Sequence, residues 1–195
     1  ANSGAGETGR SAFYHTFEHE RDYSRYVRTA QAARSWSVRP DPENPENRVL
    51  RVNYRFDEKY PRSVVVFDLP AVSVSRLRIR ARPSPGFEGT PTVGFAANDT
   101  EGHGFVFEPT PLADGAEWSL VEASFAGELR RIYRSGSPVE ERTVPPDERS
   151  ELALRRVILH VRPGPGAGPE ASFFVDFDLF ELFPARPQSH ENNTP

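Results

Sequence analysis

Short stretches in which apolar and polar residues alternate dominate this chain and set what it can fold into. In residues 50–56, apolar side chains at every second position alternate with arginine and asparagine. A period of two places alternate side chains on opposite faces of a β-strand, so each stretch is predicted to be a strand with one face on a core. The predicted strands are 11–18, 50–56, 63–69, 77–81, 92–98, 103–108, 116–125, 157–161 and 171–181.

Glycine- and proline-rich stretches separate these predicted strands. Residues 83–90, 135–150 and 163–169 are predicted to be loops, because proline cannot donate to a strand ladder and glycine permits a positive φ. Residues 20–34 instead space their apolar side chains as a helix does, and we expect a helix there. Many short strands and no convincing strand–helix–strand unit predict an all-β fold, an antiparallel β-sandwich of the jelly-roll type.

Length and charge limit the possible classes of protein. The 195 residues suffice for one sizeable core, and we expect a single domain over 11–184 between disordered segments at 1–10 and 185–195. A net charge of −4 provides no basic field for nucleic acid or an anionic membrane. No apolar run approaches the roughly 20 residues of a membrane span. Cysteine is absent, which excludes disulfides and thiolate chemistry.

The segment FFVDFDLFEL, residues 173–182, places three acids within an apolar run. In a regular strand, Asp176 and Asp178 would share one face with Phe180, and Glu181 would lie on the opposite face. The three acids have a spacing similar to the Glu-x-Asp-x-x-Glu of laminarinase- and lichenase-type β-glucanases, where a bulge brings all three into one cleft. Here the first acid is aspartate, whose side chain is about 1 Å shorter than that of a glutamate nucleophile, an error that is costly in catalysis.

Further features follow one another in chain order. They are Thr16-Phe17-Glu18, Trp36, the strand 50–56, the strand 77–81, Gly115-Ala-Glu-Trp118 and the closing segment 174–182. Together they resemble, over about residues 12–183, the galactose-binding-like jelly-roll modules that are attached to secreted glycoside hydrolases. The resemblance implies a bacterial, secreted, non-catalytic module that binds a polysaccharide or oligosaccharide, associated with other domains of a larger protein.

The same resemblance implies a structural Ca²⁺ ion. In that family a calcium ion commonly ties the first strand to the last, through carboxylates at positions that correspond to Glu18 and Asp176, with Glu20 or Asp178 as further candidates. Carboxylate oxygens are ligands that suit calcium. The alternative is that the two aspartates face solvent or pair with nearby arginines, and the sequence leaves both open.

Aromatic and polar residues outside the clearest core positions are the candidates for sugar binding. A pyranose presents an apolar C–H face to an aromatic ring, while planar polar groups bind its hydroxyls. The candidates are Phe87 in a Pro/Gly loop, Tyr133 among arginines, Asn98 and His103 in a polar turn, and Trp36 and Trp118. Ordinary packing is the alternative for each ring, above all for the two tryptophans, and an ordinary hairpin loop is the alternative for the turn.

Other functions are weighed against this one. His15-Thr-Phe-Glu-His19 has the His-x-x-Glu-His spacing of one group of zinc peptidases, but its surroundings predict a strand, where those enzymes require a helix. No nucleophile elbow, phosphate loop or dinucleotide fingerprint is present, and no catalytic residue is assigned. One alternative is a jelly-roll glycosidase or polysaccharide lyase, with its catalytic groups from Tyr133 and the surrounding arginines or from Asp176, Asp178 and Glu181 brought together by a bulge. The other is a structural or protein-interaction sandwich.

Overall fold

The computed structural model describes residues 13–15, 17, 27–115, 117–125, 132–134, 137–140 and 153–184. The segments predicted to be disordered, 1–10 and 185–195, lie outside these residues. The described residues form thirteen strands: β1 Phe13–His15, β2 Val27–Gln31, β3 Ala33–Pro40, β4 Arg48–Phe56, β5 Ser63–Pro83, β6 Thr92–Asp99, β7 His103–Val106, β8 Thr110–Pro111, β9 Ser119–Ser124, β10 Ile132–Arg134, β11 Ser137–Glu140, β12 Ala153–Arg162 and β13 Ala171–Pro184. Within this described part, no helix is long and apolar enough to cross a membrane.

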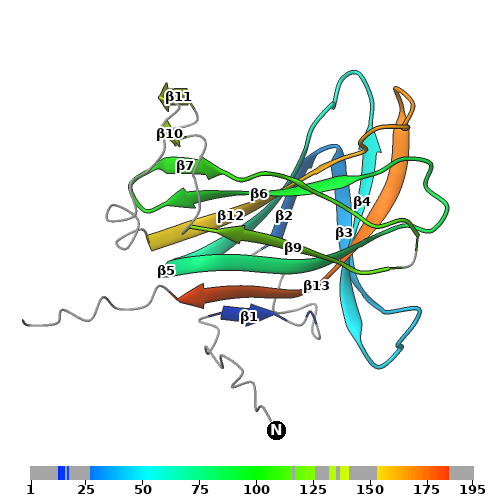
Figure 1. Cartoon of the computed structure of the whole chain (residues 1–195), viewed down its shortest axis with the longest axis horizontal. Coiled ribbons are helices and arrows are strands. Elements are labelled where there is room, and N and C mark those ends of the chain that lie inside the picture. Colours follow the sequence, from blue (N-terminus) through cyan, green and yellow to red (C-terminus); the bar gives the residue numbers. More distant parts are fainter. Residues whose placement is uncertain are drawn as a thin grey trace, which may run out of the picture.

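The strands form two antiparallel sheets. Sheet A has the order β9-β5-β13-β4-β3, with β1 paired to the C-terminal half of β13. Sheet B has the order β11-β10-β7-β6-β12-β5-β2, with β8 paired to the start of β6. In Figure 1, β5 runs across the molecule with β12, β6 and β7 above it and β13 and β1 below it. The predicted all-β, antiparallel β-sandwich is confirmed.

One long strand belongs to both sheets. β5 has 21 residues, so the predicted strands 63–69 and 77–81 are its two ends. Its first half pairs with β12 and β2 in sheet B, and its second half pairs with β13 and β9 in sheet A. The exposed Pro70 lies between the halves, beside a register shift of β12 between Leu154 and Arg156. Pairing in sheet B continues to Ser73 and pairing in sheet A begins at Val74, so the chain changes sheets just after Pro70, which cannot donate to a ladder.

The core lies between the sheets, where the alternation predicts it. Every second side chain of 50–56, 77–81 and 157–161, beginning with the first of each stretch, is apolar and buried, and the intervening residues face outward. Aromatic rings join the two layers: Phe180 of sheet A lies 4.7 Å from Phe67 and 6.5 Å from Phe95 of sheet B, measured between ring centroids. Burial of these side chains is the main stabilising contribution to the fold.

The helix predicted over 20–34 is wrong in the part that the structure describes, which begins at residue 27. Val27 pairs with Phe67 in sheet B, whereas Ala33 pairs with Tyr54 in sheet A. Gln31, at a φ of 60°, turns the chain from one sheet to the other. Of the apolar residues that suggested one helical face, Val27 and Ala30 therefore belong to a strand of sheet B and Ala33 belongs to a strand of sheet A.

The loop predictions are confirmed at one end of the sandwich. Residues 84–91 connect β5 to β6, and residues 163–170 connect β12 to β13. The loop predicted over 135–150 is wrong in part, because 137–140 form β11 and pair with β10. The remainder of that stretch lies outside the described residues.

Candidate functional site

A transverse row of residues crosses the outer face of sheet B. Arg156 of β12 pairs with Asp68 on one side and with Asn98 of β6 on the other. Asn98 pairs with Gly104 of β7, and Gly104 pairs with Tyr133 of β10. We call these five residues the sheet B row. Four interstrand steps of about 4.8 Å give the row a length of roughly 19 Å, which suits an oligosaccharide better than a single sugar ring.

The polar members of the row carry planar hydrogen-bonding groups. Asp68 accepts hydrogen bonds from Arg28, at 2.9 and 3.1 Å, and from Nε of Arg156, at 3.1 Å. More than a third of the side-chain surface of Asp68 and Arg28 is exposed, and Arg156 is nearly as accessible. The amide of Asn98 has no hydrogen-bond partner among the described residues. Guanidinium, carboxylate and amide groups held this way can donate to and accept from sugar hydroxyls.

An apolar strip lies beside the row on the same face. Val66, Ile158, Ala96 and Val106 occupy successive positions on β5, β12, β6 and β7, and Arg28 of β2 lies at the end of this strip. The valines and the isoleucine are only partly buried, although they face away from the core. The outer face of sheet B therefore combines polar groups with apolar surface, as sugar recognition requires.

Two of the sequence-predicted residues belong to this row, and a third lies next to it. Asn98 of β6 and Tyr133 of β10 each pair with Gly104 of β7, the strand between them. His103 precedes Gly104 in β7 and pairs with Arg134. The side chains of His103 and Tyr133 lie outside the described part of the structure, so their roles stay predictions.

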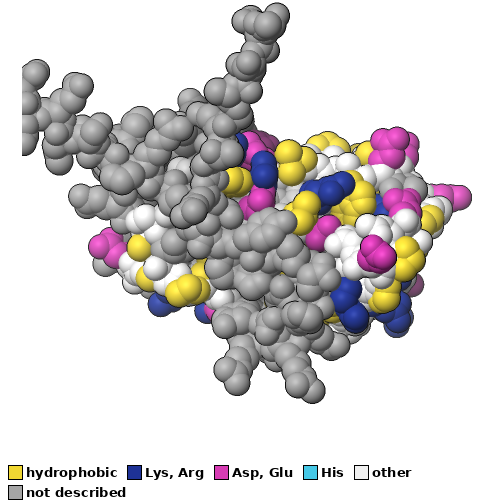
Figure 2. All heavy atoms as spheres, turned by 90° about the horizontal axis from the view of Figure 1, so that it is seen from below, with side chains coloured by type: hydrophobic (Ala, Val, Ile, Leu, Met, Phe, Trp, Pro, Cys, Tyr) yellow, Lys and Arg dark blue, Asp and Glu magenta, His cyan; other side chains and the backbone are white. Residues whose placement is uncertain are grey.

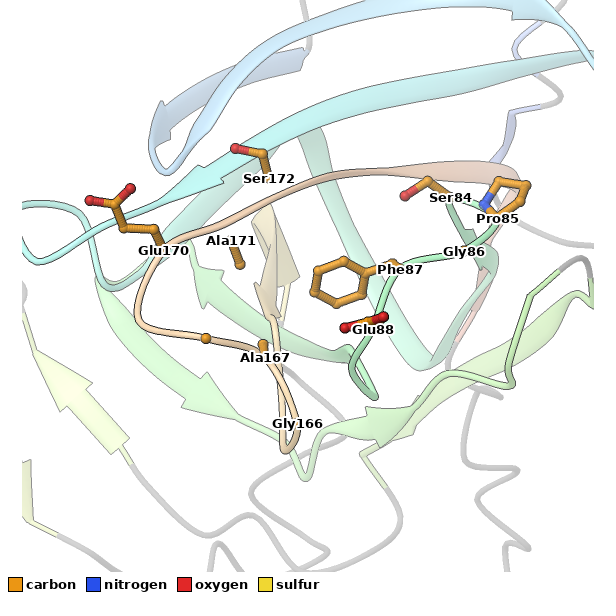
Figure 3. A pocket seen from close by; sticks show the side chains of 11 residues that line it. Ser84, Pro85, Gly86, Phe87, Glu88, Gly166, Ala167, Glu170, Ala171 and Ser172 are labelled. Atoms are coloured by element: carbon orange, nitrogen blue, oxygen red, sulfur yellow. The ribbon is translucent and has the colours of Figure 1, made fainter.

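Phe87 lies at the end of the sandwich where two loops meet. With Ser84, Pro85, Glu88 and residues 166–168 and 170–172 it lines an open pocket of about 380 Å³ (Figure 3). Its ring stacks on Phe173, with centroids 4.3 Å apart and planes at 29°. Phe173 in turn stacks on Tyr54 and Phe56. Phe87 thus anchors its loop to the core, and the sugar-binding role predicted for it rests on the part of the ring that faces the pocket.

The two loops around this pocket are locked together. Thr90 donates its backbone N–H to the carbonyl of Pro165 at 3.1 Å. Gly164 has a φ of 72°, and a Cβ there would lie 1.8 Å from the carbonyl oxygen of Thr90. Only glycine permits both the backbone conformation and this close approach. The pocket is therefore a fixed feature of the loops.

The two tryptophans lie in different surroundings. Trp36 of β3 pairs with Val52 and packs, partly buried, against the core. Trp118 precedes β9, and its ring centroid lies 4.4 Å from Cζ of Arg82 and 5.2 Å from Cζ of Arg80, at cation–π distances. The ring of Trp118 therefore lies on the outer face of sheet A. Figure 2, which views the molecule from below Figure 1, shows basic, acidic and hydrophobic side chains intermixed on its described surface.

The three acids of the closing strand lie together on the outer face of sheet A, which corrects the prediction for a regular strand. A register shift separates Asp178 from Glu181, and Leu179 between them has a φ of 51°. Because of this extra residue, Phe180 is buried in the core and Glu181 pairs with Arg78. The sequence pattern predicted the reverse placement for both.

Each of these acids already has a partner. Glu181 pairs with Arg78, and Asp178 accepts a hydrogen bond from Nδ2 of Asn47 at 3.1 Å and one from the backbone of Leu179 at 2.8 Å. Burial raises the pKa of the Asp178 carboxyl, although both hydrogen bonds lower it. Asp178 therefore keeps its proton to higher pH than an exposed aspartate does.

Asp176 forms a buried ion-pair network with two arginines. Arg51 donates to its two oxygens at 2.7 and 2.9 Å, and Nη2 of Arg82 lies 3.5 Å from Oδ2. Both oxygens that would bind calcium are therefore occupied by guanidinium groups, and Asp176 as placed does not fit a cation site. Glu18 and Glu20 lie outside the described residues. The described residues include no group of three or more His, Asp or Glu side chains that could hold a metal, and calcium binding stays a prediction.

Sequence reasoning missed the partners of the predicted residues. Arg156 and Asp68 border Asn98 in the sheet B row, and Arg51 and Arg82 hold Asp176. All four lie at outward-facing positions of strands in which polar and apolar residues alternate, and the sequence does show that alternation. The pairing of strands far apart in the chain decides which charges meet, and the alternation carries no information on that pairing.

No protein-family model and no curated protein sequence matches the chain. Solved structures match its fold. A family 11 carbohydrate-binding module from Clostridium thermocellum, solved with a β-1,3-1,4-mixed-linked tetrasaccharide, aligns with a TM-score of 0.53 and 12% identity over 82% of this chain and 88% of that one. CBM27-1 of Caldicellulosiruptor saccharolyticus, solved with mannohexaose, aligns with a TM-score of 0.56 and 11% identity over 89% and 98%. The chain has the β-sandwich fold of these modules.

The same fold also occurs as one part of a longer enzyme. An exo-β-agarase aligns with a TM-score of 0.58 and 10% identity over 91% of this chain but only 26% of the enzyme. At identities this low, the likeness establishes the shared fold and leaves function to be argued from the site.

Proposed function

We propose that this chain is a non-catalytic carbohydrate-binding module that binds a polysaccharide or oligosaccharide along the outer face of sheet B. The observation that carries the proposal is the sheet B row, in which partly exposed polar side chains of adjacent strands lie in register beside an apolar strip. The oligosaccharide complexes of proteins with the same fold support it.

The binding would combine two kinds of contact. Arg156, Asp68 and Asn98 would exchange hydrogen bonds with sugar hydroxyls, and Val66 and Ile158 would contact the apolar C–H faces of the sugar rings. The aromatic ring predicted to stack on a sugar is that of Tyr133. Arg156 and Asp68, each about a third exposed, lie side by side on neighbouring strands, an arrangement that suits a chain bound along its length.

The proposal includes an extracellular location and association with a glycoside hydrolase. Structural polysaccharides lie outside the cell, and binding them there would require secretion. The exo-β-agarase, in which this fold accounts for about a quarter of the chain, supports association with an enzyme.

Isothermal titration calorimetry against soluble polysaccharides tests the proposed site. Asn98→Ala should weaken binding roughly three- to tenfold, the loss that one or two hydrogen bonds produce. The matched control is Asn53→Ala, which removes the same amide from the exposed outer face of sheet A. Equal affinity of both variants would exclude the sheet B row as the site.

A glycosidase is the second candidate, and one observation favours it. The bulge at Leu179 places Asp176, Asp178 and Glu181 on one face, as the glucanase comparison requires. The ion pairs of Asp176 and Glu181 weigh against it, because a catalytic carboxylate must be free to bind a proton or attack the sugar. Release of reducing ends from a polysaccharide, abolished by Glu181→Gln, would establish this candidate instead.

A further inference from the structure

A second hollow, of about 190 Å³, lies on the outer face of sheet A near the end of β5. The rings of Pro42, Pro83, Pro85 and Phe174 form its apolar wall, and its polar groups come from Arg51, Arg82, Asp176 and Glu43. We call it the arginine pocket. Pro85 also lines the pocket of Phe87, so the two hollows lie on either side of the start of the β5–β6 loop.

The arginine pocket contains a buried donor whose hydrogen bond is not made. Arg82 is only 5% exposed, and its Nη2 donates to Asp41 at 2.8 Å. Its Nη1 is buried without a hydrogen-bond partner. Oε2 of Glu43 lies 2.9 Å from Nη1, but the two atoms are not in line for a hydrogen bond. A buried charged donor in this state is costly, and a better-placed acceptor would relieve that cost.

Glu43 shows which kind of acceptor this position favours. The glutamate lies in the β3–β4 loop, and 54% of its side chain is exposed, so it can leave the guanidinium with little loss of packing. A ligand carboxylate that replaces it keeps the charge attraction to Arg82, whereas a hydroxyl group would lose it. The apolar wall of proline rings and Phe174 suits the C–H face of one sugar ring.

We propose that the arginine pocket binds a carboxylate-bearing sugar unit of an acidic polysaccharide, with the ligand carboxylate displacing Glu43 from Nη1 of Arg82. The proposal rests on the proposed carbohydrate binding for its ligand class, but it uses a different sheet and different residues. Glu43 then acts as a built-in competitor that keeps the pocket closed to uncharged sugars.

Intrinsic fluorescence provides a local readout of this pocket. Trp118 lies 4.4 Å from Cζ of Arg82, and the chain has two tryptophans, so Trp36→Phe leaves Trp118 as the only reporter. Trigalacturonate is then titrated into three proteins that all carry Trp36→Phe: one with no other change, one with Glu43→Gln and one with Glu46→Gln. Glu46 is exposed, belongs to the same loop and does not line the pocket, so its variant controls for the change in net charge.

Glu43→Gln should bind trigalacturonate roughly three- to tenfold more tightly than the unchanged pocket, because the competing carboxylate is gone. Glu46→Gln should leave the affinity unchanged, and Phe174→Ala should weaken it. Neutral galactotriose should bind none of them through this pocket. Equal affinities of the two glutamine variants would overturn the proposal, and a preference for a sulfated carrageenan oligosaccharide would overturn the choice of a carboxylate.

The two proposals fail separately. If laminarin binds in an Asn98-dependent way while trigalacturonate leaves Trp118 unchanged, the sheet B row stands and the arginine pocket is excluded. If trigalacturonate binds and responds to Glu43→Gln while Asn98→Ala affects no ligand, the arginine pocket stands alone. If neither the unaltered chain nor any variant binds any of these sugars, both proposals are excluded.

Discussion

Arg51 of β4 joins Asp176 of the neighbouring β13 through two hydrogen bonds, from Nε at 2.7 Å and from Nη2 at 2.9 Å. The same guanidinium lies 3.6 Å from the centroid of the Phe174 ring. The side chain of Asp176 is 2% exposed and that of Arg51 13%. The pair therefore lies almost out of water, where loss of Arg51 leaves Asp176 with only the more distant Arg82, and loss of Asp176 leaves Arg51 without its carboxylate.

Breaking this pair should cost much of the stability of the fold. Arg51→Met should lower the free energy of unfolding by about 3–5 kcal/mol, as truncation of a buried ion pair does. Arg28→Met at the exposed Arg28–Asp68 pair is the control and should cost only about 0–1 kcal/mol. Urea unfolding measures both. Equal losses would show that Asp176 does not depend on Arg51.

The close approach of the two pocket loops predicts a contrast between two glycines. Gly86 and Gly164 have φ values of 73° and 72°, so alanine at either costs about 1–2 kcal/mol of backbone strain. A Cβ at Gly86 meets nothing within 4 Å, whereas one at Gly164 lies 1.8 Å from the Thr90 oxygen. Gly164→Ala should therefore cost about 3 kcal/mol or more. Similar thermal unfolding midpoints for the two variants would contradict the packing of these loops.

His160 should make the fold less stable as the pH falls. Burial lowers the pKa of its ring below the usual 6.5, as do the charges of Arg162 and Arg62, although the hydrogen bond from Nδ1 to the Ser63 carbonyl raises it. Below pH 6.5 the unfolded chain binds a proton that the folded chain resists, so the free energy of unfolding falls until the lowered pKa is passed.

Chemical denaturation across this pH range tests the effect of His160. The His160→Gln variant should lose the part of the pH dependence that lies just below pH 6.5. Parallel curves for the two proteins would mean that the ring titrates alike in the folded and unfolded states.

The ion pairs of Asp176 also set an expectation for calcium. With both carboxylate oxygens held by guanidinium groups, EDTA should leave the thermal unfolding midpoint unchanged. Differential scanning calorimetry with EDTA and with excess CaCl₂ measures it. A midpoint that drops on chelation and recovers with Ca²⁺, but not with Mg²⁺, would instead support the ligand set implied by the resemblance.

The sequence is sufficient for the sandwich but not for its irregularities. Alternation identifies the buried positions because every second side chain of a strand faces the core. One extra residue at Leu179 reverses that phase, which exchanges the faces of Phe180 and Glu181. The bulge depends on how β13 pairs with β5, a strand about a hundred residues earlier, and no local pattern specifies it.

The sequence indicated which residues could bind a sugar, but it did not indicate which of them lie side by side on one surface. Asn98 and Tyr133 carry suitable groups, but they lie in one row only because both pair with Gly104 of β7. The sequence left open whether Phe87 in its Pro/Gly loop packs or binds sugar, and the loop places its ring on Phe173. In both cases the long-range pairing of strands and loops decides the outcome.

Affinity electrophoresis of the unaltered chain on soluble polysaccharides, with reducing ends assayed on the same panel, tests the central claim most directly. We predict that at least one polysaccharide retards the chain and that no reducing ends are released. Release of reducing ends would contradict a non-catalytic role and return attention to Asp176, Asp178 and Glu181. Free migration on every polysaccharide of the panel would contradict carbohydrate binding itself.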